Sequence, residues 1–122
     1  MATVLIVEDE LARLYREAIG LLGAGKHTIF VASRGDEGVR KARALQPDLI
    51  IMDLRLPGRI DGMAAIKRIR EFNETVPVLA MTAYSDEHRR QEVLAAGATE
   101  YLVKPVEMND LLATVDRLLE GA

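Results

Sequence analysis

The sequence predicts an α/β fold, a doubly wound parallel sheet with helices on both faces. Five short runs rich in Val, Ile, Leu and Thr have apolar centres, as strands covered by helices on both faces require. Segments with apolar residues at spacings of three and four, typical of amphipathic helices, lie between and after them. Five such alternations with right-handed crossovers leave few topologies, and an open doubly wound sheet satisfies them.

The five expected strands follow one another along the whole chain, at residues 3–8, 28–33, 48–54, 77–83 and 99–104. Pro47 and Pro77 stand in the loops that enter the third and fourth strands, and Gly97 suits a helix C-terminal cap. The chain shows no repeat, linker or low-complexity segment. We therefore expect residues 1–122 to form one domain.

Four helices are predicted from clear apolar stripes. These stripes comprise Leu11, Leu14, Ala18, Ile19 and Leu22; Val39, Ala42 and Leu45; Met63, Ile66 and Ile69; and Leu111, Leu112, Val115, Leu118 and Leu119. Asp61-Gly62 predicts a turn and the start of the third helix. The segment 86–96 is less apolar, with only Val93 and Ala96 expected to point inward. We expect that helix to be the most weakly anchored.

Composition excludes several function classes. The 122 residues are 49% hydrophobic and 29% charged with a net charge of −3, which argues against nonspecific binding to nucleic acid or membranes. Without cysteine there is no disulfide, thiolate nucleophile or Cys-based zinc site. MATVLIVEDE at the N-terminus turns acidic too early for a secretory signal, and the longest aliphatic run has four residues, 49–52. We expect a cytoplasmic protein with no direct nucleic-acid or membrane partner.

The stretch GLLGAGKHT, from Gly20 to Thr28, nearly matches a nucleotide-binding phosphate loop, except that His27 stands where Ser or Thr is usual. Such a loop follows a strand and opens a helix, so that backbone N–H groups face the anion. Here the order is reversed, because the glycines close a helix and lead into a strand. Gly23 and Gly25 are therefore interpreted as a helix stop.

A cluster of polar residues is expected at the carboxyl ends of the strands, where open α/β sheets bind ligands. Glu8-Asp9 ends the first strand, Asp53 the third, Thr82 the fourth and Lys104-Pro105 the fifth. Each has an ordinary alternative role, such as a helix cap for Asp9 or a solvated cation for Lys104. Taken together they predict one pocket with three carboxylates, a hydroxyl and an ammonium.

Three clustered carboxylates repel one another, by about 4 kcal/mol for a pair ~4 Å apart at an effective dielectric constant of 20. Mg²⁺ relieves such repulsion, and it favours carboxylates together with water and phosphate oxygens. A carboxylate, Mg²⁺, a lysine and a hydroxyl suit phosphoryl transfer to the carboxylate itself. Asp53 would attack the phosphorus, while the metal and Lys104 neutralise the oxygens and Thr82 donates a hydrogen bond.

The sequence resembles the receiver domain of two-component response regulators over its whole length, chiefly single-domain regulators of the chemotaxis and sporulation type. The segments that carry the resemblance are LIVEDE, PDLIIMDLRLPG, LAMTAYSD and YLVKP, in matching order and spacing. The resemblance implies a flavodoxin-like (βα)5 sheet with strand order 2-1-3-4-5. It also implies Mg-dependent phosphorylation (Mn²⁺ being possible) by a sensor histidine kinase or a histidine phosphotransfer protein, and a downstream partner protein or effector domain.

The resemblance assigns a role to individual residues. Asp53 corresponds to the phosphoacceptor and a metal ligand, Asp9 to a direct metal ligand and Glu8 to a ligand through water, with the backbone carbonyl of Arg55 completing the set. Thr82 and Lys104 correspond to the switch hydroxyl and the phosphate-binding lysine, Tyr101 to the switch aromatic, and Ala83 to the small residue beside it. The bond before Pro105 is expected to be cis. Signal output is expected at the surface of the fourth helix, fifth strand and fifth helix.

Two features depart from the family pattern. The loop Pro57–Gly62 is one residue longer than usual, and Arg55 and Tyr84 are bulky at the two positions that tune dephosphorylation. We hypothesise that these two side chains crowd the attacking water and slow self-dephosphorylation. Arg89 and Arg90 are expected to form a solvated helix face.

Three other functions share part of this residue pattern. An aspartate-nucleophile phosphohydrolase needs an acid two residues after the nucleophile, where this chain has Arg55. A flavodoxin-type FMN binder has its phosphate loop after the first strand, where Glu8-Asp9-Glu10 would repel phosphate. A degenerate receiver acts only as an interaction module and lacks some of the residues needed for the chemistry, whereas this chain has all of them. We therefore expect a phosphorylatable receiver that catalyses only its own phosphorylation and dephosphorylation and is not otherwise an enzyme.

Overall fold

The computed structural model describes residues 2–20, 27–83 and 87–120. Five parallel strands form one sheet in the order β2-β1-β3-β4-β5, as the resemblance implied. The strands are β1 (Thr3–Val7), β2 (Thr28–Ala32), β3 (Leu49–Asp53), β4 (Val78–Thr82) and β5 (Glu100–Val103). They lie inside the predicted ranges.

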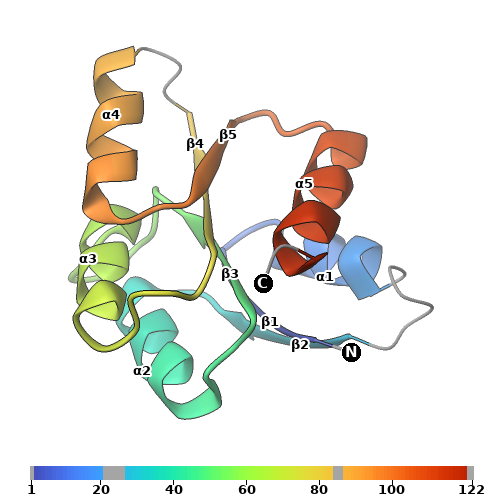
Figure 1. Ribbon diagram of the computed structural model, residues 1–122, viewed down its shortest axis with the longest axis horizontal. Helices are drawn as coiled ribbons and strands as arrows, with labels where there is room; N and C mark the ends of the chain where they lie inside the picture. The colour runs from blue at the N-terminus through green and yellow to red at the C-terminus, as the bar shows by residue number, and fades with distance from the viewer. Residues whose placement is uncertain (1, 21–26, 84–86, 121–122) are drawn as a thin grey trace.

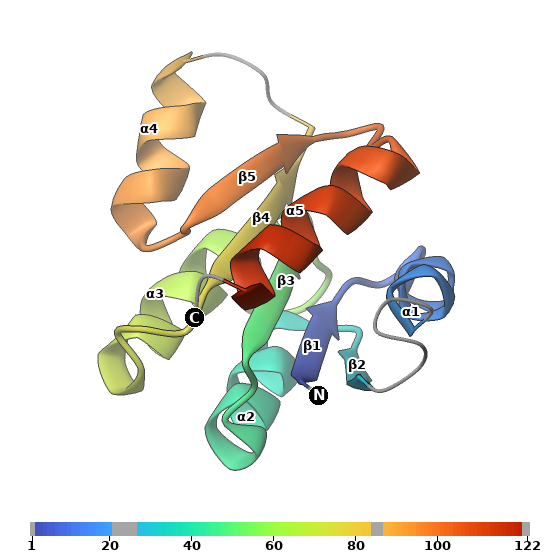
Figure 2. The same ribbon diagram turned by 45° about the vertical axis from the view of Figure 1, so that its right-hand side comes forward.

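Five helices cover the two faces of the sheet (Figures 1 and 2). They are α1 (Ala12–Gly20), α2 (Gly35–Leu45), α3 (Gly62–Phe72), α4 (Glu87–Ala96) and α5 (Met108–Glu120). Helices α1 and α5 lie on one face, and α2, α3 and α4 on the other. Two apolar clusters fill the spaces between sheet and helices, one on each face. Strands β3 and β4 are fully buried because both clusters cover them.

The inward stripe predicted for helix α1 is wrong in part. The predicted inward stripe included Leu11 and Leu14, but these are 41% and 51% exposed. Ile19 of the predicted stripe is buried and Ala18 is half-buried, whereas Leu22 lies outside the described residues; Ala12 and Tyr15 are the other buried residues of the helix. Gly23 and Gly25 lie outside the described residues, but the segment does follow α1 and precede β2, as expected.

The other helices follow their predicted stripes more closely, although of the α2 stripe only Ala42 is buried and Val39 and Leu45 are half-buried. In α3, Ile66 and Ile69 are buried, and in α5 Leu111, Val115 and Leu118 are. Helix α4 buries only Val93 and Ala96, in agreement with the expected weak anchoring. Among the described residues, no helix combines the length and apolarity needed to cross a membrane.

The C-terminal end of α4 is attached to α3 through Arg70. Gly97 follows α4 with a φ of +124°, a conformation that favours glycine. The Arg70 Nε donates to the Gly97 carbonyl at 2.8 Å, and its guanidinium also donates to the Asn73 carbonyl at 3.1 Å. Burial lowers the pKa of Arg70. The hydrogen bonds of this side chain thus connect the ends of two neighbouring helices.

Candidate functional site

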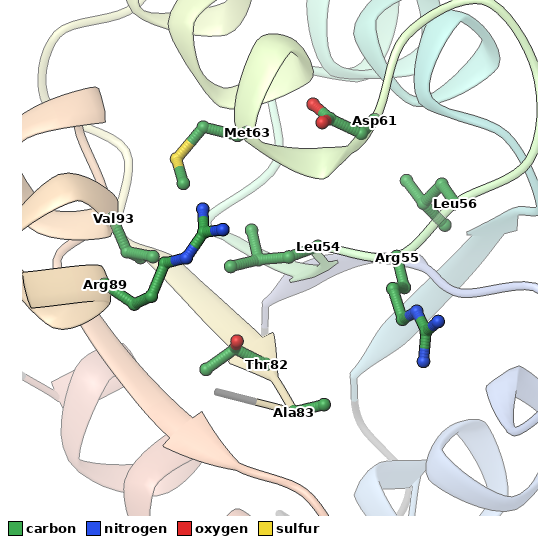
Figure 3. A pocket seen from close by; sticks show the side chains of 9 residues that line it. All are labelled: Leu54, Arg55, Leu56, Asp61, Met63, Thr82, Ala83, Arg89 and Val93. Carbon is green, nitrogen blue, oxygen red and sulfur yellow. The ribbon is translucent and has the colours of Figure 1, made fainter. Parts of the chain in front are cut away.

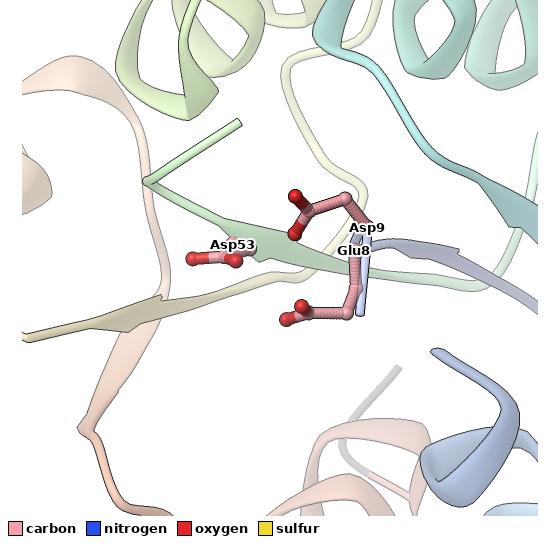
Figure 4. Close-up of side chains that lie close together, drawn as sticks. All are labelled: Glu8, Asp9 and Asp53. Atoms are coloured by element: carbon pink, nitrogen blue, oxygen red, sulfur yellow. The ribbon is translucent and has the colours of Figure 1, made fainter. Parts of the chain in front are cut away.

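The predicted carboxylates do meet at the carboxyl end of the sheet. Glu8 follows β1 and Asp53 ends β3, and both are 2% exposed, whereas Asp9 is exposed. The two strands are adjacent and parallel, which brings their ends to the same edge. One oxygen of each of the three carboxylates lies within 4.8 Å of the others (Figure 4).

The ammonium of Lys104 joins two of these carboxylates. Lys104 follows β5, and its Nζ lies 2.9 Å from Asp53 Oδ2 and 3.3 Å from Glu8 Oε2. Partial burial disfavours the charged ammonium, but the hydrogen bond and charge of Asp53, then those of Glu8, outweigh it and raise the pKa of Lys104. The lysine is therefore a fixed cation of this pocket and not the solvated side chain of the ordinary alternative.

Glu8 also determines how α1 begins. Its Oε1 accepts hydrogen bonds from the backbone N–H groups of Glu10, at 3.2 Å, and Leu11, at 3.4 Å. These donors precede Ala12, the first residue of α1, so the buried Glu8 carboxylate orders the turn that leads into the helix.

The donor set fits a hard divalent cation. Three carboxylates face one ammonium, so negative charge remains in excess, and Mg²⁺ prefers such oxygen ligands. Both Glu8 oxygens already accept hydrogen bonds, which suits a ligand acting through water. Asp9 and Asp53 are the carboxylates suited to direct contact. Asp53 Oδ1 accepts from the Arg55 backbone N–H at 3.1 Å; the role of the Arg55 carbonyl stays a prediction.

The start of α3 lies directly against the end of β3. A Cβ added at Gly62 would stand 2.1 Å from the Asp53 carbonyl oxygen. Asp61 caps the helix, because its Oδ1 accepts from the Ala64 N–H at 2.8 Å. The turn predicted from Asp61-Gly62 is thus present, but this tight contact with Asp53 could not be recognised in the sequence.

The predicted switch residues lie on β4, which pairs with β3, and on the edge strand β5. Thr82 ends β4 and is 3% exposed, and its carbonyl accepts from the Lys104 N–H at 2.7 Å. Tyr101 is half-buried in β5. The guanidinium carbon of Arg90, which was expected only to be solvated, lies 5.6 Å from the centre of the Tyr101 ring. The sequence did not predict this contact between α4 and β5, because no sequence periodicity relates two residues eleven positions apart on different elements.

Two further expectations concern the neighbouring loops. The Lys104–Pro105 peptide bond is cis, as expected. Tyr84 lies outside the described residues. Arg55 is exposed beside the acidic pocket, and Ala83 lines that pocket together with Asp53 and Lys104.

The family model of the response regulator receiver domain matches residues 4–116. The chain belongs to this family. Receivers of this family act in two-component signalling and are phosphorylated on an aspartate. Family membership also decides against the phosphohydrolase and FMN-binding alternatives.

Relatives and solved structures support the assignment of this receiver. It is 33% identical to the protein PilH of Pseudomonas aeruginosa, over 99% of this chain and 100% of that protein. It is 34% identical to the transcriptional regulatory protein ZraR of Escherichia coli over 95% of this chain, but spans only 26% of ZraR. The chemotaxis protein CheY4 of Vibrio cholerae superimposes with a TM-score of 0.87 at 30% identity, covering 97% of this chain and 98% of that one.

Proposed function

We propose that this receiver accepts a phosphoryl group on Asp53 from a sensor histidine kinase or a histidine phosphotransfer protein. The observation that carries the proposal is the buried Asp53 carboxylate with the Lys104 ammonium at 2.9 Å and two further carboxylates beside it. An ion pair that served only to stabilise the fold would not require a third carboxylate, the exposed Asp9, beside it.

The residues of the pocket divide the chemistry among them. An Asp53 carboxylate oxygen attacks the phosphorus, and the Lys104 ammonium neutralises charge on the phosphoryl oxygens. The hydroxyl of Thr82 donates a hydrogen bond to the bound phosphoryl group. Asp9 and Asp53, with Glu8 through water and the Arg55 carbonyl, would hold Mg²⁺ or Mn²⁺. When bound, that ion supplies positive charge to the transferring group.

The signal leaves through α4. A phosphoryl group adds nearly two negative charges, so that Thr82 moves toward it and Tyr101 turns into the space beside Ala83. Because Arg90 of α4 contacts the Tyr101 ring and α4 buries only two residues, this rotation shifts the helix. A downstream protein or effector domain then recognises the face made by α4, β5 and α5. The protein contacts neither nucleic acid nor membrane directly and acts in the cytoplasm.

The chain catalyses only its own phosphorylation and dephosphorylation. Arg55 and Tyr84 crowd the water that would attack the phosphoryl group, and so lengthen the lifetime of the phosphorylated protein. Replacing either with Ala should shorten that lifetime, measured as the decay of the phosphorylated mass. An unchanged or longer lifetime in Arg55→Ala and Tyr84→Ala would contradict this role.

The central test is incubation with acetyl phosphate and Mg²⁺, followed by intact mass measurement. We expect a gain of one phosphoryl group that disappears in Asp53→Asn and when EDTA removes the metal. Mn²⁺ should substitute for Mg²⁺. A gain that persists in Asp53→Asn, or no gain with any phosphodonor, would refute the proposal.

A further inference from the structure

Two cavities adjoin at the phosphorylation site. One, of about 300 Å³, contains Asp53, Lys104 and the acidic residues that follow β1. The other, of about 360 Å³, lies between the β3–α3 loop and α4 (Figure 3). Arg55 and Ala83 line both cavities, so a molecule whose one end sits at Asp53 can extend past these two residues into the second.

The second cavity differs chemically from the first. Four apolar side chains, Leu54, Leu56, Met63 and Val93, form much of its wall. A small apolar group would be shielded from water there, and the volume lies in the range of small-molecule sites.

The charges around the second cavity favour an anion at its mouth. Arg55 and Arg89 both line it, and Arg89 extends from α4 toward Met63 and Leu54 (Figure 3). Asp61 is the one acidic residue of the wall, and its Oδ1 is engaged in capping α3. A carboxylate that leaves the phosphorus near Arg55 would thus meet that guanidinium, while its hydrocarbon part meets the apolar wall; the Arg89 guanidinium, which also lies 3.6 Å from a Glu92 oxygen, adds positive charge on the α4 side of the cavity.

We propose that the second cavity binds the acyl chain of an acyl phosphate, so that this receiver accepts phosphoryl groups preferentially from acyl phosphates longer than acetyl phosphate. The proposal rests on the proposed function and adds a substrate class to it. An Asp53 oxygen forms a bond to phosphorus, the bond from phosphorus to the acyl oxygen breaks, and its electron pair leaves with the fatty carboxylate. No proton or redox partner is needed at neutral pH.

The size of the preference follows from the burial of methylene groups. Each fully buried methylene increases affinity about fourfold. Butyryl phosphate has two more methylenes than acetyl phosphate, and its leaving carboxylate has nearly the same basicity. Because the cavity is open on one side, we expect the second-order rate of Asp53 phosphorylation to be about four- to tenfold higher with butyryl phosphate.

The experiment compares acetyl phosphate, butyryl phosphate and phosphoramidate, which has no acyl chain, by intact mass at a fixed Mg²⁺ concentration. Met63→Ser removes part of the apolar wall at the second residue of α3, where serine is tolerated in the first turn. Met108→Ser is the matched control, because Met108 is also half-buried in the first turn of a helix, α5, away from both cavities. We expect Met63→Ser to lose most of the butyryl preference and keep the phosphoramidate rate, and Met108→Ser to keep both.

The outcomes separate this inference from the proposed function. Equal second-order rates with the two acyl phosphates, or a butyryl preference that Met63→Ser leaves intact, would overturn the acyl-chain site while Asp53 phosphorylation stands. Phosphorylation by none of the three donors would overturn both. If Met63→Ser slows all donors equally, the side chain supports the fold and the inference is also wrong.

Discussion

Replacing Lys104 by methionine tests the electrostatics of the pocket, because this change removes the ammonium but keeps an unbranched side chain. The ammonium lies 2.9 Å from an Asp53 oxygen and 3.3 Å from a Glu8 oxygen. At an effective dielectric constant of 20, each contact corresponds to about 5 to 6 kcal/mol of Coulomb attraction, before desolvation is subtracted. Breaking a buried pair by removing one partner usually costs about 3 to 5 kcal/mol. The Lys104 side chain is 26% exposed, so we expect the lower end, about 3 kcal/mol.

Urea unfolding at pH 7 would measure this loss of unfolding free energy, with and without Mg²⁺. Saturating Mg²⁺ should recover more stability in Lys104→Met than in the unmodified protein, because no ammonium then repels the metal. Arg117→Met is the control. It breaks an exposed ion pair with Glu100, so its effect on the unfolding free energy should be small beside that of Lys104→Met. If Lys104→Met is as stable as the unmodified protein, or if Mg²⁺ stabilises both equally, the described balance of charges is wrong.

Three further predictions concern packing, the buried face of α1 and pH. Gly62→Ala should lower the unfolding free energy in urea by about 3 kcal/mol or more and weaken Mg²⁺ binding, because its Cβ would stand 2.1 Å from the Asp53 carbonyl oxygen. Unchanged stability and Mg²⁺ affinity would show that the end of β3 can move away at no cost. Ile19→Ala should cost about 2 to 5 kcal/mol and Leu14→Ala less than about 0.5 kcal/mol; equal costs would indicate that Leu14 is buried together with Ile19, as first predicted. The Glu37 carboxylate accepts a hydrogen bond from the Ser33 backbone N–H at 2.8 Å, and this bond lowers the pKa of Glu37; partial burial opposes the shift, and the charge of Lys41 adds a smaller lowering effect. The stability from Glu37 is therefore present above the ordinary glutamate pKa and is lost as pH falls through the folded value. Glu37→Gln should flatten the fall in unfolding free energy below about pH 4.5, and an unchanged pH profile would contradict the assignment.

The sheet and the polar cluster at its edge could be predicted because both follow from simple regularities. Strands buried on both faces need continuous apolar runs, and parallel strands bring their carboxyl ends together. Glu8, Asp53 and Lys104 are far apart in sequence, but each directly follows or ends such a run. Their convergence therefore required only the strand boundaries and the order of the strands.

The sequence did not predict in this way which face of α1 is buried or which contacts α4 makes. Leu11 and Leu14 match a helical stripe as well as Ala12, Tyr15 and Ile19 do, so spacing alone does not identify the buried face. The buried Glu8 carboxylate accepts hydrogen bonds from the backbone just before the helix, a contact that spacing does not indicate. Burial, followed by the nearby charge of Glu8, raises the pKa of Tyr15, a neighbourhood that no local pattern indicates.

The hydrogen bond from Arg70 to the Gly97 carbonyl bears on the proposed shift of α4. It holds the C-terminal end of the helix, where Val93 and Ala96 are also buried, whereas the first five residues, 87–91, are all exposed. A helix of ten residues is about 15 Å long. If the proposed shift turned the helix about Gly97, a tilt of about 10° would displace the opposite end by roughly 2.6 Å, given the rise of about 1.5 Å per residue. The displacement would then be largest at the exposed N-terminal end of α4.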